Sequence, residues 1–378
     1  MTDERTAAQS QPPVAGATRT GRLGYLDWLR GAAVLVMVEA HVFDAWTRPE
    51  DKGGPVYGWL MMLGGMGAPL FLFLAGVAVS LAAASHARRG VPLREASRRV
   101  RVRGWQIFGY AFLLRLQSFV LGGFHAPVSL LKVDVLNIMG PSIVATAALW
   151  SLALTRRRRA ALLAAAAALV ALTTPPIRGT PWIAWLPDPL EWYVRPSAGH
   201  TNFTLFPWGG FVLAGGVLGL GLEGASGRWS AARVQGAILL TGGGLLAGCW
   251  WASLQPSLYE SAGFWTSSPA FFGLRVGLLL LAVAGSWAWS ARPWRHPART
   301  SPLEVLGIGS LFVYWVHLEL VYGIFGLPLR ARQPIERTAV AFLVLCGLMY
   351  GLLALWNRSR PARTRFWETL ITRDVRTS

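Results

Sequence analysis

The stretch from Leu26 to Trp46 constrains this chain more than any other. It reads LDWLRGAAVLVMVEAHVFDAW and is long and apolar enough to cross a bilayer, which takes about 20 apolar residues. It nevertheless contains titratable side chains, namely Asp27, Arg30, Glu39, His41 and Asp44. A charge near the centre of a bilayer costs roughly 2.5–3.5 kcal/mol, so such residues usually line a site or a water-filled cavity. We therefore expect a membrane-crossing helix that carries a functional site.

The spacing of these residues predicts two polar faces on that helix. At about 100° and 1.5 Å per residue, Arg30 and His41 lie within roughly 20° of one face and about 16 Å apart. Asp27 and Asp44 extend this stripe at each end, whereas Glu39 points to nearly the opposite side. A helix with two polar faces is unsuited to the lipid rim, so we expect other helices around it and a cavity beside the stripe.

The composition is that of an integral membrane protein. Of 378 residues, 53% are hydrophobic and only 14% are charged, with 19 Trp. The net charge of +18 does not indicate a nucleic-acid partner, because the arginines fall in clusters between apolar stretches. Cys249 and Cys346 both lie within apolar stretches, so they predict neither a disulfide framework nor a metal site.

The expected fold is an all-α, polytopic helix bundle in three parts. Residues 1–22 form a disordered cytoplasmic tail, 23–357 a single transmembrane domain, and 358–378 a basic cytoplasmic tail. The first apolar stretch is expected to be an uncleaved span rather than a signal peptide. We expect ten spans, at about 26–46, 57–84, 104–122, 133–154, 160–175, 204–222, 234–254, 269–291, 304–325 and 338–356.

The arginine clusters predict the orientation of these spans. With ten spans, the clusters at 88–103, 156–159, 228–233 and 292–299 fall on one side, which places both termini in the cytoplasm. The longest outer loop, 175–202, is rich in Pro and Trp. It could cap a site and contact an acceptor, or its aromatic residues could form an interfacial belt.

A second histidine is expected at the depth of His41. In the span 304–325, Ser310, Tyr314 and His317 share one helical face at spacings of four and three. His317 is thirteen residues into its span and so reaches roughly the depth of His41. Neutral imidazole is the usual proton carrier at neutral pH, so we expect chemistry at His41, whereas His317 could have either a chemical or a structural role.

Other buried polar residues are expected near the outer ends of two spans. Asp134 and Asn137 share one helical face. Arg115 lies eleven residues into its span and needs an anionic partner, for which Asp44, Glu39 and Asp134 are candidates. These charges could also be structural pairs that hold helices in register. No His, Asp and Glu residues have the spacing of a convincing metal site, so no metal is expected.

Several motifs in order resemble one group of enzymes. LDWLRGAAVLVMVEAH, followed by GAPLFLFLAGVAVSL, is similar to the start of the transmembrane acyltransferases, above all the bacterial relatives of heparan-alpha-glucosaminide N-acetyltransferase. The arginine and histidine at positions 30 and 41 also match the spacing seen in the acyltransferase-3 families. Further matches are Val133–Gly140, Thr204–Gly219 and Leu306–Gly323, so the resemblance extends from about residue 22 to 325.

The resemblance implies transfer of an acyl group, expected to be acetyl, from cytosolic acyl-CoA to an acceptor on the far side of the membrane. The acceptor would be a hydroxyl or amine of a sugar, a glycan or a lipid-linked sugar. In this interpretation His41 is the general base, and Asp44 or Asp134 holds its imidazole and stabilises the imidazolium. The implied location is a bacterial inner membrane, and a homo-oligomer is compatible with the sequence.

Binding roles are expected for the remaining polar residues. Arginines bind the phosphates of coenzyme A well, so Arg30 and Arg115 are assigned to the donor. The residues expected to bind the acceptor or to polarise the thioester carbonyl are Asn137, Ser310, Tyr314 and His317.

Two other classes of function remain open at this point. A transporter or proton-coupled carrier of ten helices could use the same buried histidines and carboxylates as a proton relay, although no internal repeat supports this. A non-enzymatic membrane partner would not need His41. Transfer from labelled acyl-CoA by purified protein in vesicles distinguishes an acyltransferase from the other two classes.

Overall fold

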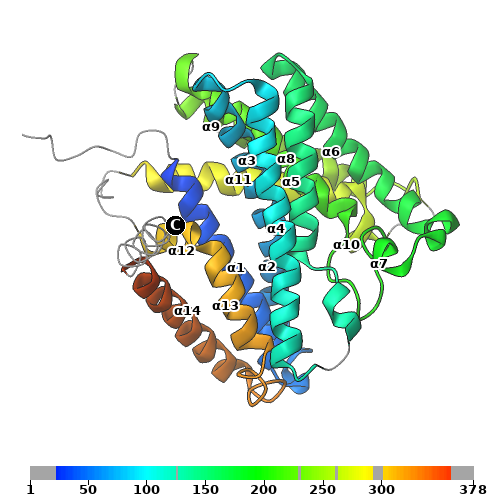
Figure 1. Ribbon diagram of the computed structural model, residues 1–378, viewed down its shortest axis with the longest axis vertical. Helices are drawn as coiled ribbons and strands as arrows, with labels where there is room; N and C mark the ends of the chain where they lie inside the picture. Colours follow the sequence, from blue (N-terminus) through cyan, green and yellow to red (C-terminus); the bar gives the residue numbers. More distant parts are fainter. Residues whose placement is uncertain (1–22, 125–126, 229–230, 260–262, 293–300, 359–378) are drawn as a thin grey trace, which may run out of the picture.

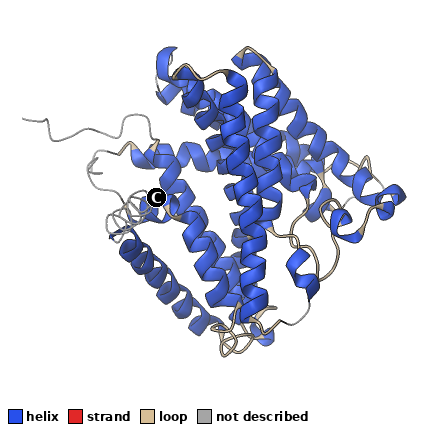
Figure 2. Ribbon diagram, viewed as in Figure 1, coloured by secondary structure: helices blue, strands red, loops and turns tan. Residues whose placement is uncertain are grey.

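The computed structural model describes residues 23–124, 127–228, 231–259, 263–292 and 301–358. Of these described residues, 81% are helical, and they contain no strand (Figure 2). This confirms the expected all-α fold. The tails expected at 1–22 and 358–378 lie outside the described residues, apart from Arg358.

The main helices overlap all ten expected stretches, although 57–84 and 304–325 are each divided between two helices. They are α1 (Gly24–Trp46), α2 (Pro55–Gly64), α3 (Gly67–Arg88), α4 (Leu93–Leu121), α5 (Val135–Leu152), α6 (Arg156–Gly179), α8 (Leu205–Arg228), α9 (Ala231–Ser253), α11 (Pro269–Ser290), α12 (Pro302–Ile308), α13 (Ser310–Tyr322) and α14 (Ile335–Arg358). Short helical turns complete the chain: η1 (Pro49–Asp51), η2 (Pro127–Leu131), η3 (Pro181–Trp185), α7 (Asp188–Glu191) and α10 (Phe264–Ser267).

The expected count of ten membrane spans is not confirmed. Among the described residues, seven helical stretches are long and apolar enough to cross a membrane, or eight if the bent pair α12–α13 is one span. α1 and α4 fall outside this set. The reason is their polar content, which includes Asp27, Arg30 and Glu39 on α1 and Gln106 and Arg115 on α4. The two helices that least resemble ordinary spans therefore carry expected site residues, among them Arg30 and His41 on α1 and Arg115 on α4.

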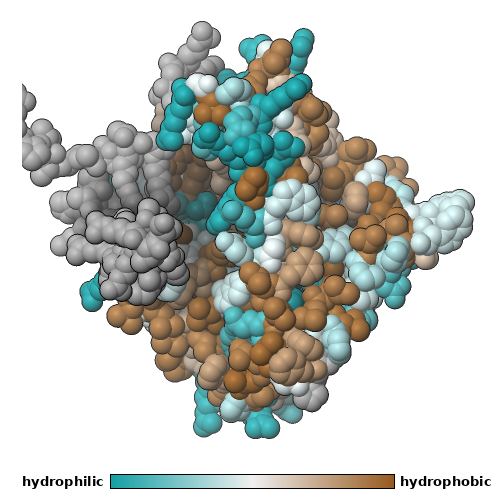
Figure 3. Space-filling view, viewed as in Figure 1, coloured by the Kyte–Doolittle hydropathy of each residue, from teal (hydrophilic) through white to brown (hydrophobic). Residues whose placement is uncertain are grey.

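The chain is an integral membrane protein whose helices form two neighbouring groups. In Figure 1, α12, α13 and α14 pack with α1 on one side of α4, and α5, α6 and α8 lie on the other. α3 and α8 cross so closely that a Cβ at Gly76 would meet the carbonyl of Val212, and one at Gly215 would meet that of Phe73. Figure 3 shows a hydrophilic surface at the upper and lower ends of the viewed face and a mostly hydrophobic surface between them.

Helix α6 is longer than the short span expected there. Alanine and leucine are the strongest helix formers in its sequence, and the Thr155 side chain caps its start by accepting from the backbone N–H of Arg158. The helix continues through Pro175 and Pro176 to Gly179. Proline lacks the N–H that would bond the carbonyl four residues earlier. The carbonyl of Leu172 instead accepts a hydrogen bond from the Tyr259 hydroxyl at 2.8 Å.

The expected span 304–325 is broken into two helices. α12 and α13 meet at Gly309 with a bend of 86°. α12 packs against α1 so tightly that a Cβ at Gly307 would meet the carbonyl of Asp27. The bend then turns α13 along the half of α1 that carries His41. The tight packing of α12 on α1 thus determines where His317 on α13 lies.

Candidate active site

Two histidines from distant parts of the chain form the centre of the site. Nδ1 of His41 on α1 lies 2.8 Å from Nε2 of His317 on α13. Their rings stack with centroids 5.1 Å apart and an angle of 6° between the planes. His317 is fully buried, whereas His41 is half-buried. The structure thus brings together the two histidines that the sequence placed at one depth.

A backbone carbonyl determines which ring nitrogens carry protons. Nδ1 of His317 lies 2.8 Å from the carbonyl oxygen of Val313, which can only accept. Nδ1 of His317 must therefore carry the hydrogen, and Nε2 of the neutral ring is an acceptor. His41 then donates from Nδ1, which leaves the lone pair of neutral His41 on Nε2. Nε2 of His41 has no hydrogen-bond partner among the described residues.

The partner expected for the His41 imidazole needs correction. Neither Asp44 nor Asp134 is hydrogen-bonded to His41; its imidazole partner is His317. The side chain of Asp44 is 58% exposed and accepts a hydrogen bond from the Tyr322 hydroxyl at 3.3 Å. Asp44 comes one helical turn after His41, at the end of α1, where it reaches the surface instead of the ring.

Asp134 uses both of its carboxylate oxygens in other contacts. It is the N-cap of α5, where Oδ1 accepts from the backbone N–H of Val135 at 2.7 Å. Its Oδ2 accepts from Nη2 of Arg115 at 2.7 Å. Of the three partners expected for Arg115, the structure selects Asp134. The side chains of this ion pair are 19% and 16% exposed, so the pair links α4 to α5 in a largely buried environment.

Asn137 connects the same helix end to the loop between α6 and α8. Its Oδ1 accepts from the backbone N–H of Asp134 at 3.0 Å, which completes a capping box. Its Nδ2 donates to the Tyr193 hydroxyl at 3.3 Å. Within the loop expected to cap the site, Tyr193 therefore reaches the site's edge. Trp182 and Trp185 of the same loop are instead exposed on the surface.

The other residues of the expected face on α13 lie at different distances from the histidines. Tyr314 is buried, and its ring meets that of His317 edge-on, with centroids 5.9 Å apart. Ser310 is the first residue of α13. Among the described residues, no hydrogen bond joins its side chain to either histidine.

The other end of the α1 stripe carries an ion pair. Nη1 of Arg30 lies 3.1 Å from Oδ1 of Asp27, and the Arg30 side chain is 24% exposed. Glu39, on the opposite face, is buried, and neither of its carboxylate oxygens has a hydrogen-bond partner among the described residues. Glu39 is therefore not the partner of Arg115, although it was a candidate.

Sequence reasoning missed the contacts that hold α13 against α4. The Ser118 hydroxyl donates to Glu319 Oε1 at 2.6 Å, and Trp315 Nε1 donates to Gln117 Oε1 at 2.8 Å. Residues two apart on a helix point about 200° apart, so Trp315 and Glu319 face α4 while His317 faces α1. A usable signal was present in the polar residues Gln117 and Ser118, which lie two and three residues after Arg115 in the apolar second half of α4.

The described residues contain no group of three or more His, Cys, Asp and Glu side chains that could hold a metal ion. The polar groups at the site are instead two imidazoles, an arginine–carboxylate pair and three tyrosine hydroxyls within one junction of α1, α4, α5 and α13. Such an arrangement can bind polar groups and accept a proton at Nε2 of His41.

Comparison with known proteins identifies the family. No individually curated protein matches the chain. The sequence profile of the family described as heparan-alpha-glucosaminide N-acetyltransferase, catalytic, matches residues 22–241, more than half of the chain. The matched region contains His41, Arg115, Asp134 and Asn137, whereas His317 lies beyond it. The chain therefore belongs to the heparan-alpha-glucosaminide N-acetyltransferase catalytic family and is a membrane acetyltransferase.

Proposed function

We propose that this protein transfers an acetyl group from acetyl-CoA on the cytoplasmic side to a hydroxyl or amine of a sugar or glycan on the other side. Family membership supports acetyl transfer. The chain of hydrogen bonds from the Val313 carbonyl through His317 to His41 supports His41 as the base. It leaves one imidazole nitrogen with a lone pair at a half-buried position, and that observation carries the proposal.

The reaction balances through His41 without any other proton acceptor. The acceptor oxygen or nitrogen attacks the thioester carbonyl carbon, and its proton moves to Nε2 of His41. The carbon–sulfur bond then breaks, and the sulfur of coenzyme A takes that proton from the imidazolium. General-base assistance of this kind contributes typically 10²–10⁴ in rate. Meanwhile Nδ1 of His41 keeps donating to His317 throughout, so the ring stays oriented.

The acceptor is expected to approach from the end of α1 beyond His41. Asp44 and Tyr322 lie there, joined by a hydrogen bond, and both are exposed. The Tyr322 ring is edge-on to His41 with centroids 5.5 Å apart. A carboxylate and a phenol beside a base suit the binding of sugar hydroxyl groups. Tyr193 and Asn137 border the same junction.

The donor is expected to enter from the opposite end of α1. Arg30 lies about 16 Å from His41 along the helix and has Asp27 as one partner. The start of α4 carries exposed arginines, among them Arg94. Guanidinium groups bind phosphate oxygens bidentately, which suits the phosphates of coenzyme A. The Arg115 guanidinium is engaged by Asp134, so we assign Arg115 to positioning rather than to the donor.

The test is transfer by purified protein in sealed vesicles. Radiolabelled acetyl-CoA is supplied on the side of the arginine-rich loops, and glucosamine or an oligosaccharide on the other side. An acetylated acceptor, formed only when both are present, supports the proposal. Labelled acetate or acetyl-CoA that crosses the membrane without acetylating the acceptor would point to a carrier instead.

A further inference from the structure

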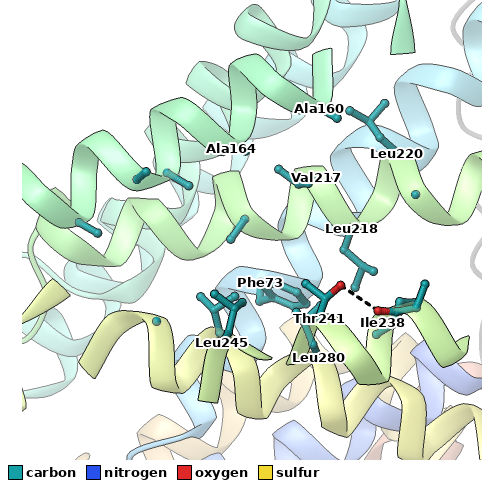
Figure 4. Close-up of a pocket in the computed structure, with 18 of the residues that line it drawn as sticks. Phe73, Ala160, Ala164, Val217, Leu218, Leu220, Ile238, Thr241, Leu245 and Leu280 are labelled. Carbon is teal, nitrogen blue, oxygen red and sulfur yellow. Dashed lines mark hydrogen bonds between the residues drawn. The ribbon is translucent and has the colours of Figure 1, made fainter. Parts of the chain in front are cut away.

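A long groove lies outside the histidine site. Helices α3, α6, α8, α9 and α11 line this groove, whose volume is about 930 Å³, within the size range of common ligand sites. Figure 4 shows Ala160 and Ala164 on one side and Phe73, Thr241 and Leu245 close together on the other. None of the residues that build the histidine site lines this groove.

The wall of the groove is apolar, and two of the helices that form it, α6 and α9, are largely exposed. Five alanines on one face of α6, including Ala164 and Ala168, leave room that larger side chains would fill. Leu245, Leu280 and Val276 line the other wall. Only 28% of the apolar stretch of α6 and 11% of that of α9 are buried within the protein. An apolar surface this open in a membrane suits alkyl chains.

Positive charge is confined to one end of the groove. Arg156 and Arg157, in the first turn of α6, and Arg233, in the first turn of α9, line that end. None of the three forms an ion pair with another described residue. The first turn of α6 contains no acidic residue, although the positive end of a helix dipole disfavours arginines there. A bound anion would offset this unfavourable arrangement.

We propose that the groove binds one anionic membrane phospholipid, with its acyl chains along the apolar wall and its phosphate among Arg156, Arg157 and Arg233. The charge complements a phosphate only at that end, and the rest of the groove offers surface for chains alone. This site is separate from the acetyl-transfer reaction. It would hold α9 and α11 against α6 and α8 through a shared lipid.

The direct test measures which lipid remains with the protein. Protein reconstituted in nanodiscs of equal phosphatidylglycerol and phosphatidylcholine with identical chains is extracted into mild detergent, and its lipids are quantified by native mass spectrometry. We expect about one retained phosphatidylglycerol per chain and a strong preference over phosphatidylcholine. Equal retention of the two lipids would overturn the proposal and leave ordinary contact with bulk lipid.

Charge variants separate the groove from general surface attraction. The triple variant R156Q/R157Q/R233Q removes the groove arginines, and R89Q/R94Q/R158Q removes three exposed arginines that do not line it. The first should weaken phosphatidylglycerol binding by roughly a factor of 100, and the second by much less. Equal losses in both variants would overturn the proposed headgroup site.

Volume variants test the position of the chains without any change of charge. A164F/A168F fills the groove, whereas A161F/A165F adds the same bulk to neighbouring exposed positions of α6 outside it. Only the first pair should abolish lipid retention while the protein stays monodisperse. If A164F/A168F instead dissociates an oligomer, as measured by light scattering, the groove is the contact site of a second copy of the chain and the lipid proposal is wrong.

Discussion

The histidine junction and the groove between α6 and α9 use opposite means to make a site. At the junction, individual atoms are placed by hydrogen bonds, from Val313 through His317 to His41 and from Asp134 to Arg115. In the groove, polar side chains are concentrated at one end, and the rest is shaped by side-chain volume. We therefore expect activity at the junction to depend on single polar atoms. Binding in the groove should depend instead on side-chain size and net charge.

The largest effect is expected on the acetyl-transfer rate when His41, at the centre of the junction, is replaced. His41→Ala should insert and fold normally but lower acetyl transfer by roughly 10²–10⁴, because the proton acceptor is lost. His41→Gln should not restore the rate, since an amide cannot take the proton. Rates are measured with labelled acetyl-CoA, and A161F/A165F serves as a folded control. Near-normal transfer by His41→Gln would remove His41 from catalysis and move attention to His317.

The next effect concerns stability rather than rate. Asp134→Ala removes an N-cap, worth about 1 kcal/mol, and leaves the largely buried Arg115 without its partner. Breaking a fully buried ion pair costs about 3–5 kcal/mol. Because this pair is partly exposed, we expect the cap and the pair together to contribute about 3 kcal/mol to the free energy of unfolding. The thermal unfolding midpoint in detergent should fall accordingly. Asp134→Asn keeps the cap and should lose less. Equal midpoints for all three proteins would show that the pair does not hold α4 to α5.

A smaller effect is expected for the residue that orients the base. His317→Ala removes the acceptor for Nδ1 of His41, and a lost buried hydrogen bond costs about 1–3 kcal/mol, roughly a factor of 5–150 in rate. The loss should fall on kcat rather than KM, and His317→Gln should recover part of it, because its amide oxygen can accept. An unchanged kcat with a raised KM would make His317 an acceptor-binding residue instead.

The smallest effect belongs to the exposed arginine-rich end of α4. Hydrogen bonds from Arg98 and Arg99 lower the pKa of Glu95 from its usual 4.5 to about 2. A lowered carboxylate pKa stabilises the folded state above the unfolded pKa, and this contribution disappears as the pH falls from about 4.5 towards 2. Glu95→Gln should therefore reduce the unfolding midpoint slightly at neutral pH and not at all near pH 2. A difference that grows with acidity would contradict this sign.

Much of the fold follows from the sequence alone. Long apolar stretches interrupted by arginine clusters predict membrane helices, since a bilayer leaves few other structures available. The polar stripe on residues 26–46 predicts that this helix is surrounded by others and carries a site. These features are local or periodic, so one sequence suffices to recognise them. The count of ten spans is not confirmed for the same local reason, because the charges that mark α1 as functional also make it unlike an ordinary span.

The partners of the site residues were decided only by the tertiary structure. Helical periodicity places His41 and His317 at similar depths but does not say how two helices are rotated against each other. The 86° bend at Gly309, set by the tight packing of α12 on α1, turns the buried imidazole of His317 towards His41. Asp44 is closer in sequence, yet it points to the surface. Contacts between helices depend on packing across the whole bundle, and this is why a histidine 276 residues away took the place expected for a neighbouring carboxylate.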